Sequence, residues 1–238
     1  MNDHPHFTAS QFIRYLAAHL QVSPESFGVR PDVVISYLGQ LPAIADQWGL
    51  SEAPARFHGM ILCNDRLALM KGPVGAPAAA NLLEELAALG AERIWVLGYA
   101  GSLDPHWSLG DVAWIARAWS DEGTSAQYGR SGWAEASPQL AARLRGAVGP
   151  ASLWTTDAIY RETPRKIDHF HSIGCHLVDM ETSCYFHIGE ILGVHVAAVM
   201  VVTDELYHPW NPGFGSPPVL SGVAQAYGLI GGILSSQP

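Results

Sequence analysis

The sequence has few cysteines, and their pattern excludes a disulfide framework. The 238 residues include three, at Cys63, Cys175 and Cys184, which are odd in number, far apart and never in a C-x-x-C spacing. Such usage is typical of a reducing compartment, so we expect a cytoplasmic protein. The first twelve residues also lack a basic region leading into an apolar one, so no signal peptide is expected.

Positive charge and long apolar runs are also scarce. Lysine and arginine total 13 against 22 acidic residues, which gives a formal net charge of −9. This balance disfavours nucleic-acid polymers and anionic membranes as partners. The longest apolar run, Val194 to Val202, is interrupted by His195 and is far shorter than the roughly 20 residues of a membrane span. Eight tryptophans and a charged fraction of 15% favour large buried interfaces, hence a homo-oligomer, with dimer, trimer of dimers and hexamer all open.

Helical and strand patterns alternate along the chain. Apolar residues recur at helical spacing or in short buried-type runs, which predicts helices over 8–20, 78–89, 137–148, 181–192 and 218–234, and strands over 32–37, 67–70, 94–97, 112–116 and 194–202. Gly98 is expected to end the strand over 94–97. Alternation of this kind indicates an α/β sandwich with a largely buried sheet. We expect one domain over 1–238, in which residues 1–30 form an N-terminal helical extension.

Two glycine-rich turns follow predicted strands. Gly72 to Pro77 precedes a helix, and Gly98 to Ser102 follows the strand over 94–97. Glycine allows the backbone to approach a ligand closely, and the N-terminus of a helix offers free N–H groups. Neither turn has the G-x-G-x-x-G or P-loop spacing, so tight packing explains each turn equally well.

Two acids at the edges of regular structure carry the chemical hypothesis. Glu181 opens a predicted helix, where capping is the simpler explanation, although its two oxygens also suit the vicinal hydroxyls of a sugar. Asp204 follows seven apolar residues and Thr203. An acid at the end of a buried strand is costly unless it is paired or functional, and ligand sites of α/β sheets lie outside strand ends. Function is therefore favoured at Asp204.

The order of several short segments resembles the purine nucleoside phosphorylase and uridine phosphorylase family. These segments span about residues 30 to 205, and the most specific are the Met-Glu-Thr and Thr-Asp steps. They are the glycine-rich turn at 72–77, Glu84-Glu85-Leu86, Leu97 to Leu103, Gly110-Asp111, Asp121 to Ser125, Tyr128, Val178 to Thr182 and Val202 to Asp204. The resemblance implies a three-layer sandwich around a central mixed, partly barrel-like sheet.

The resemblance also implies roles for individual residues. Glu181 and Met180 match the family's ribose-contacting pair, and Asp204 matches the acid that faces the base and protonates it as it leaves. The implied catalytic residues are thus Asp204 and Glu181. The implied substrate-binding residues are Met180, Asp179, Ile159, Tyr160, Gly98, Tyr99, Ala100, Arg165 and Thr203. Arg165 falls where uridine enzymes carry a base-reading arginine, but Thr163 stands at their glutamine position, which favours a purine.

The family's phosphate-binding residues are mostly missing. Val96 and Tyr99 occupy positions where phosphorylases carry an arginine and a Ser or Thr. A desolvated dianion needs several donors and positive charge, and only Gly75, Arg56 and Lys71 are candidates to supply them. The nucleophile is therefore either phosphate held in another way or water, as in the family's hydrolytic nucleosidases.

Histidines offer no convincing metal site. His169, His171, Cys175 and His176 have ligand residue types, but their spacing matches no zinc pattern, so we expect neither a metal nor a cofactor, and phosphate is a candidate co-substrate. The resemblance leaves open whether His4 or His6 reaches a neighbouring subunit's site. We expect a cofactor-free enzyme that cleaves a small-molecule nucleoside by phosphorolysis. Hydrolysis of the same bond and a non-catalytic nucleoside-binding protein are the alternatives.

Overall fold

A closed, barrel-like part lies within a larger mixed sheet. The computed structural model describes residues 5–207 and 209–236. Strands follow the order β11-β10-β6-β8-β9-β5-β1-β4-β3-β2, and an additional pairing of β10 with β5 closes the ring β10-β6-β8-β9-β5. β7 pairs with β6 outside this ring. The strands are β1 Asp32–Ser36, β2 Ser51–Glu52, β3 Ile61–Cys63, β4 Leu67–Lys71, β5 Arg93–Ser102, β6 Val112–Asp121, β7 Gly132–Glu135, β8 Gly149–Thr156, β9 Leu177–Asp179, β10 His195–Glu205 and β11 Asn211–Pro212.

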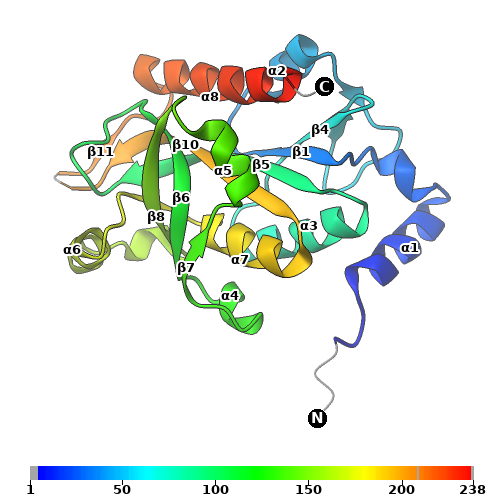
Figure 1. Ribbon diagram of the computed structural model, residues 1–238, viewed down its shortest axis with the longest axis horizontal. Coiled ribbons are helices and arrows are strands. Elements are labelled where there is room, and N and C mark those ends of the chain that lie inside the picture. The colour runs from blue at the N-terminus through cyan, green and yellow to red at the C-terminus, as the bar shows by residue number, and fades with distance from the viewer. Residues whose placement is uncertain (1–4, 208, 237–238) are drawn as a thin grey trace.

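Helices cover both faces of the sheet, which confirms the three-layer α/β sandwich (Figure 1). In that view α2 and α8 lie above the sheet, and α3 and α7 lie below it. The α-helices are α1 Ala9–Leu20, α2 Leu41–Trp48, α3 Ala76–Ala88, α4 Thr124–Gln127, α5 Pro138–Leu144, α6 Pro164–Ser172, α7 Thr182–Leu192 and α8 Pro217–Ser235, and the 3-10 turns are η1 Pro24–Phe27 and η2 Ile159–Arg161. The core lies between these layers, because β1, β5 and β10 carry buried apolar runs that helices cover.

Three strands extend well beyond their predicted ends, and one of them is β6, which continues from Ala116 to Asp121. β5 does not stop at Gly98 but continues to Ser102, and β10 continues past Val202 to Glu205. β5 and β10 pair in parallel over this whole length. Each strand therefore provides the backbone hydrogen-bond partners that let β5 continue past Gly98 and β10 continue past Asp204. Conversely, α5 ends at Leu144, because the chain enters β8 at Gly149.

The C-terminal helix α8 is long and apolar enough, by length and composition, to cross a membrane. Its buried residues include Val219, Val223 and Tyr227, and the helix contacts β10, β5 and β6. The hydroxyls of Tyr227 and Ser36 lie 2.8 Å apart in a hydrogen bond that ties the helix to β1. One face of α8 is thus packed against the sheet.

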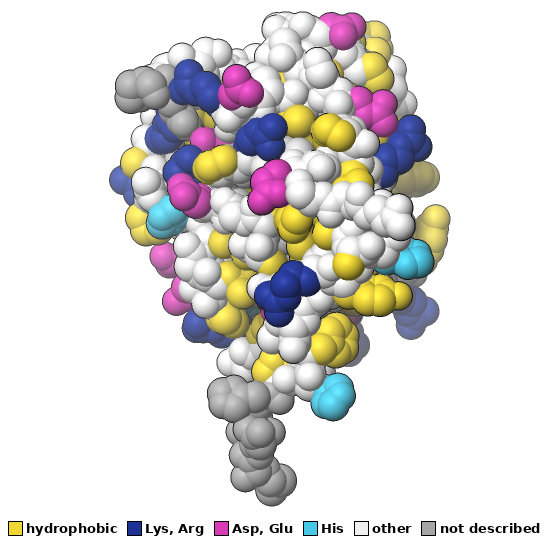
Figure 2. All heavy atoms as spheres, turned by 90° about the vertical axis from the view of Figure 1, so that its right-hand side faces the viewer, with side chains coloured by type: hydrophobic (Ala, Val, Ile, Leu, Met, Phe, Trp, Pro, Cys, Tyr) yellow, Lys and Arg dark blue, Asp and Glu magenta, His cyan; other side chains and the backbone are white. Residues whose placement is uncertain are grey.

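The N-terminal extension presents apolar side chains to solvent. Figure 2 shows the face that carries α1, where hydrophobic side chains are scattered among charged ones. Phe7, Phe12, Tyr15 and Leu20 are among the exposed large apolar residues of the chain. No partner is identified by this surface, so the homo-oligomer stays a prediction.

Candidate functional site

Glu181 lies where the barrel meets the lower helices. It is the N-cap of α7, yet its side chain makes no capping bond with that helix. Instead, Oε1 of Glu181 accepts a 2.6 Å hydrogen bond from the backbone N–H of Gly75, the N-cap of α3. Capping of α7 is done by Asp179, whose Oδ2 accepts from the N–H of Thr182 at 2.9 Å. The simple capping explanation therefore fits Asp179 and leaves a Glu181 oxygen available to a ligand.

Asp179 connects β8 to the first turn of α7 through hydrogen bonds. Its Oδ1 accepts from the hydroxyl of Thr155 in β8 at 2.8 Å, and the same hydroxyl accepts from the N–H of Ser183 at 2.9 Å. Burial raises the pKa of Asp179, and the hydrogen bonds from Thr182 and Thr155 oppose that rise. Burial, followed by the negative charge of Asp179, raises the pKa of Glu181 to about 8. The two acids thus share one buried corner in which a single negative charge is favoured.

A second buried carboxylate supports the start of α7. Glu122, after β6, accepts hydrogen bonds from the N–H of Thr124 at 2.6 Å and from the hydroxyl of Ser183 at 3.2 Å, and also from Ser120 and Ser125. Burial acts to raise the pKa of Glu122, but the hydrogen bonds from Ser125, Ser120 and Thr124 outweigh it and lower that pKa. Glu122 therefore helps to fix the first turn of α7 through Ser183.

Asp204 is positioned by an irregularity in β10. The register between β10 and β5 shifts between Val202 and Asp204, so that Thr203 is a bulge residue and Asp204 lies opposite Gly101. Bulges commonly re-aim side chains beside sites. A Cβ at Gly101 would lie 2.4 Å from Leu206 Cδ1 and 3.5 Å from Asp204 Oδ1, so glycine leaves the room that these side chains occupy. Asp204 accepts from Thr203 Oγ1 at 3.0 Å and from Trp210 Nε1 at 2.9 Å.

Both acids line one cavity of about 1110 Å³. The cavity brings together most of the residues that the sequence predicted: Gly98, Tyr99, Ala100, Ile159, Tyr160, Asp179, Met180, Glu181, Thr203 and Asp204. They come from β5, the turn η2, the β9–α7 junction and β10, which are distant in sequence. Ile159 and Tyr160 leave 44% and 95% of their surface exposed, so the protein itself does not cover their apolar surface.

The remaining predicted residues lie outside the cavity lining. Gly75 contributes through its hydrogen bond to Glu181. Arg165, on α6, is exposed and does not line the cavity although its neighbour Pro164 does. Lys71 is an exposed residue at the end of β4, and Arg56 forms an exposed ion pair with Glu52 at 3.3 Å. Within one chain, these three cations do not meet the cavity.

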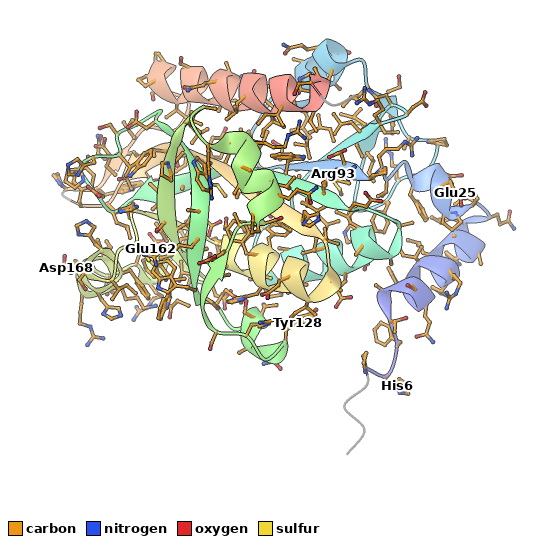
Figure 3. The ribbon with its side chains drawn as sticks, in the orientation of Figure 1. His6, Glu25, Arg93, Tyr128, Glu162 and Asp168 are labelled. Atoms are coloured by element: carbon orange, nitrogen blue, oxygen red, sulfur yellow. The ribbon has the colours of Figure 1, made fainter. Side chains whose placement is uncertain are left out.

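Of the two N-terminal histidines, His6 is the one in the described part of the chain. His4 lies outside the described residues. His6 lies at the end of the molecule opposite Glu162 and Asp168, and Asp168 belongs to α6 (Figure 3). In the described part of the chain, no group of three or more His, Cys, Asp or Glu side chains is arranged to hold a metal ion. The absence of a cofactor stays a prediction.

Tyr37 is a cavity residue that the sequence analysis did not select. Its ring packs on the first glycine turn, where a Cβ at Gly72 would lie 2.5 Å from Tyr37 Cζ. Its hydroxyl donates to the carbonyl of Pro73 at 2.9 Å and lies 3.0 Å from the hydroxyl of Tyr185. Only the register of β1 beside β4 and β5 brings this ring over the turn, so no local pattern indicates it. The space left by the missing side chain of Gly72 is therefore occupied by the ring of Tyr37.

Glu162 is the second residue missed. It follows η2 and lines the same cavity as Asp204. Burial, followed by the negative charge of Asp204, raises the pKa of Glu162 to about 7, and the nearby ammonium of Lys166 opposes this. In the described structure no hydrogen-bond donor reaches the Glu162 carboxyl. The local signal was an acid two residues after Tyr160 in a loop that follows a buried strand.

Acidic side chains predominate in the lining of the cavity. Five carboxylic side chains line it: Glu162, Asp168, Asp179, Glu181 and Asp204. Among the residues described, no lysine or arginine does, and His171 is the one basic side chain in the lining. Such a site favours neutral or cationic ligands with hydrogen-bond donors over anions.

Comparison with known proteins places these features in a family. The model of the phosphorylase superfamily matches residues 49–212. The chain is 30% identical over 133 residues to the uncharacterized protein R802 of Acanthamoeba polyphaga mimivirus, covering 56% of this chain and about half (54%) of that protein. It is 28% identical over 184 residues to a guanosine phosphorylase of Halorubrum lacusprofundi, covering 71% of this chain and 75% of that protein.

Solved structures share the fold. A uridine phosphorylase from Vibrio fischeri ES114 superposes with a TM-score of 0.74 at 22% identity and covers 89% of this chain and 95% of its own. An AMP nucleosidase from Bacteroides thetaiotaomicron superposes with a TM-score of 0.70 at 19% identity and covers 94% of this chain and 98% of its own. At these identities the likeness concerns the fold alone.

Proposed function

Because the chain belongs to the phosphorylase superfamily, we propose that it is an enzyme that cleaves the N-glycosidic bond of a nucleoside and releases the free base. One observation carries this proposal: Glu181 and Asp204, delivered by separate elements, line the same cavity. Val178 lies opposite Gly101 and Asp204 lies beside Gly101, whereas Glu181 is three residues beyond Val178. Three residues of chain span at most roughly 10 Å, so the two acids lie close enough for a ribose at one and a base at the other.

The chemistry follows from where charge develops. Breaking the bond leaves a cationic sugar and an anionic base, and a proton delivered by Asp204 to the base removes the second charge. General acid catalysis of this kind contributes roughly 10²–10⁴-fold to the rate. Glu181, with one oxygen fixed by Gly75, offers its other oxygen to the ribose hydroxyls. A fixed ribose exposes its anomeric carbon to a nucleophile on the face opposite to the base.

Water is the nucleophile that the cavity favours. The sequence favoured phosphorolysis, with Gly75, Arg56 and Lys71 as candidates for the phosphate. In the structure, Tyr37 covers the first glycine turn, the N–H of Gly75 is taken by Glu181, and the cavity lining has acids in place of lysine and arginine. A phosphate dianion needs several donors and compensating charge, so these features support a hydrolytic nucleosidase.

Phosphorolysis is the second candidate, and the likeness to a guanosine phosphorylase favours it. It requires that a neighbouring subunit bring cations to the cavity, for which the exposed Arg56 is available. The same relative supports a purine as the base. A nucleoside-binding protein without turnover is the third candidate, and the paired acids Glu181 and Asp204 speak for an enzyme instead.

A nucleoside panel incubated with and without phosphate tests the proposal. Free base, free ribose and ribose 1-phosphate are quantified by chromatography for purine and pyrimidine nucleosides, with Asp204→Asn as the matched inactive control. Base and free ribose at equal rates in both conditions support the nucleosidase. Base release that depends on phosphate and yields ribose 1-phosphate supports the phosphorylase. No release from any nucleoside, with binding retained, would overturn the enzymatic proposal.

A further inference from the structure

The cavity continues beyond the point where Asp204 meets the base. β5 and β10 run parallel, with Met200 opposite Gly98 and Asp204 opposite Gly101, and both chains continue in the same direction to Leu103 and Leu206. Gly98, Gly101 and Leu103 line the cavity in this order. The strand direction therefore defines a path from the ribose end, past Asp204, to a further space some two residues, or roughly 7 Å, away.

The size of the cavity supports a larger occupant than a simple nucleoside. Its volume of about 1110 Å³ exceeds the roughly 300–1,000 Å³ that is usual for small-molecule sites. A nucleoside at Glu181 and Asp204 would leave the space beyond Asp204 unfilled.

That space has an apolar floor. Leu103, Pro105, Ile167 and Leu206 line it and are called the far compartment here. Leu103 and Ile167 belong, with Val178, to an apolar cluster separate from the main core, and Leu206 packs against that cluster. The outer edge carries the exposed Asp168 and His171 on α6. An apolar group that enters the far compartment would be removed from water on one side and meet polar groups only at its tip.

Hydrogen-bond acceptors stand at the entrance to this compartment. Glu162 lines the same cavity as Asp204, and no donor from the described residues reaches its carboxyl. The lining residues include no asparagine, glutamine, lysine or arginine among those described. The Glu162 carboxyl therefore offers acceptor oxygens to a ligand that brings its own N–H donor to this position.

We propose, on the basis of the function proposed above, that the substrate is a nucleoside whose base carries an exocyclic N–H bearing a bulky apolar substituent. The N–H donates to the Glu162 carboxylate, and the substituent fills the far compartment. Glu162 is thus a specificity-determining residue, and the substrate class is an N-alkylated or N-arylated aminopurine nucleoside.

The test compares three probes on the wild-type protein. They are adenosine, N6-benzyladenosine, and the ribonucleoside of 6-(benzylthio)purine, which keeps the apolar group but lacks the N–H. We expect kcat/KM for N6-benzyladenosine to exceed that for adenosine at least tenfold, and the sulfur-linked analogue to lose about tenfold relative to N6-benzyladenosine. A preference for adenosine over N6-benzyladenosine would overturn the far compartment as a subsite.

Two substitutions test which residues produce the preference for N6-benzyladenosine. Leu206→Trp fills the far compartment from a half-buried position, so the ratio of kcat/KM for N6-benzyladenosine to adenosine should fall at least tenfold. Glu162→Ala should abolish the difference between the nitrogen-linked and sulfur-linked probes. The matched control is Leu220→Trp on the exposed face of α8, where 46% of the leucine surface is accessible and the ratio should not change. An unchanged ratio in Leu206→Trp would contradict the proposal.

Failure of the proposed function gives a different result from failure of this inference. If the wild type cleaves adenosine but ignores the benzyl group, only the far compartment is refuted. If no nucleoside is cleaved, calorimetric binding of 6-benzylaminopurine against adenine decides instead. Tighter binding of the benzylated base that is lost in Leu206→Trp supports the subsite, and equal binding of both bases overturns it.

Discussion

The backbone N–H of Gly75 donates a 2.6 Å hydrogen bond to Oε1 of Glu181, and each of these residues is the N-cap of its own helix. The bond therefore joins the first turns of α3 and α7 across the lower layer of the sandwich. It also fixes the carboxyl of Glu181 in the cavity wall without using both of its oxygens. The glycine turn and the Met-Glu step, which are about a hundred residues apart, form one structural unit.

Asp204→Asn separates binding from chemistry. The asparagine amide retains an acceptor oxygen for Trp210 and Thr203 but cannot deliver a proton to the base. We expect the ligand Kd to stay within about tenfold and kcat to fall by about 10² or more. Single-turnover assays together with calorimetry check this, with Asp46→Asn on the exposed surface of α2 as control. Equal kcat in Asp204→Asn and the wild type would remove Asp204 from the chemistry.

Glu181→Ala chiefly damages ribose binding. The variant loses the acceptor for the ribose hydroxyls and leaves the Gly75 N–H without its partner, so Kd for a ribonucleoside should rise at least tenfold. Glu181→Gln keeps an acceptor oxygen, so its Kd should lie between the Kd of Glu181→Ala and that of the wild type. Glu190→Ala, at an exposed position of the same helix, serves as control. Unchanged ribonucleoside affinity in Glu181→Ala would count against this role.

Two buried carboxyls should change stability with pH in opposite directions. The pKa of Glu181 is raised from 4.5 to about 8 in the fold, so its contribution is complete at low pH and is lost as pH rises through about 8. Glu181→Gln should therefore gain stability relative to the wild type between pH 4.5 and 8.

The pKa of Glu122 is lowered by its hydrogen bonds, so its contribution is complete above pH 4.5 and is lost as pH falls through its folded pKa. Glu122→Gln should cost about 1–3 kcal/mol at pH 7, and this cost should shrink in acid. Urea unfolding from pH 3 to 9 measures both differences. If Glu181→Gln and Glu122→Gln changed the free energy of unfolding at pH 7 in the same direction, the opposite pKa shifts assigned to Glu181 and Glu122 would be contradicted.

Gly72→Ala tests whether Tyr37 fills the first glycine turn. The new Cβ would lie 2.5 Å from Tyr37 Cζ, so the substitution should cost about 1–3 kcal/mol of unfolding free energy. In a Tyr37→Leu background those ring atoms are absent, and most of the cost should disappear in a double-mutant cycle. Gly228→Ala in α8 has open space around it and provides the matched control, with a small gain in stability expected. Additive effects at Gly72 and Tyr37 would refute the contact.

The sequence was sufficient for the fold class, and it selected two acids that the structure brings to one cavity. Alternating helix and strand patterns indicated the sandwich, and an acid after a buried apolar strand is unusual enough to mark Asp204. Glu181 was found through the order of short segments that resemble a family. The length of β5 was not predictable, because Gly98 normally weakens a strand, whereas here β10 supplies the ladder partners along β5 from Arg93 to Ser102.

Tyr37 and Glu162 were missed for a related reason. Tyr37 acts through the register of β1 with β4 and β5, and Glu162 acts through a turn that only tertiary packing brings toward Asp204. Neither position has a periodic or compositional signature. Residues whose role depends on long-range register cannot be identified from a local pattern.

The acidic lining has a consequence for discrimination among cellular metabolites. Nucleotides carry phosphate groups that would bring two or more negative charges next to Glu181, Asp179 and Asp204 with no lysine or arginine of the described lining to balance them. If the proposed function holds, the same acidic lining that disfavours inorganic phosphate would disfavour nucleoside mono-, di- and triphosphates relative to the uncharged nucleoside.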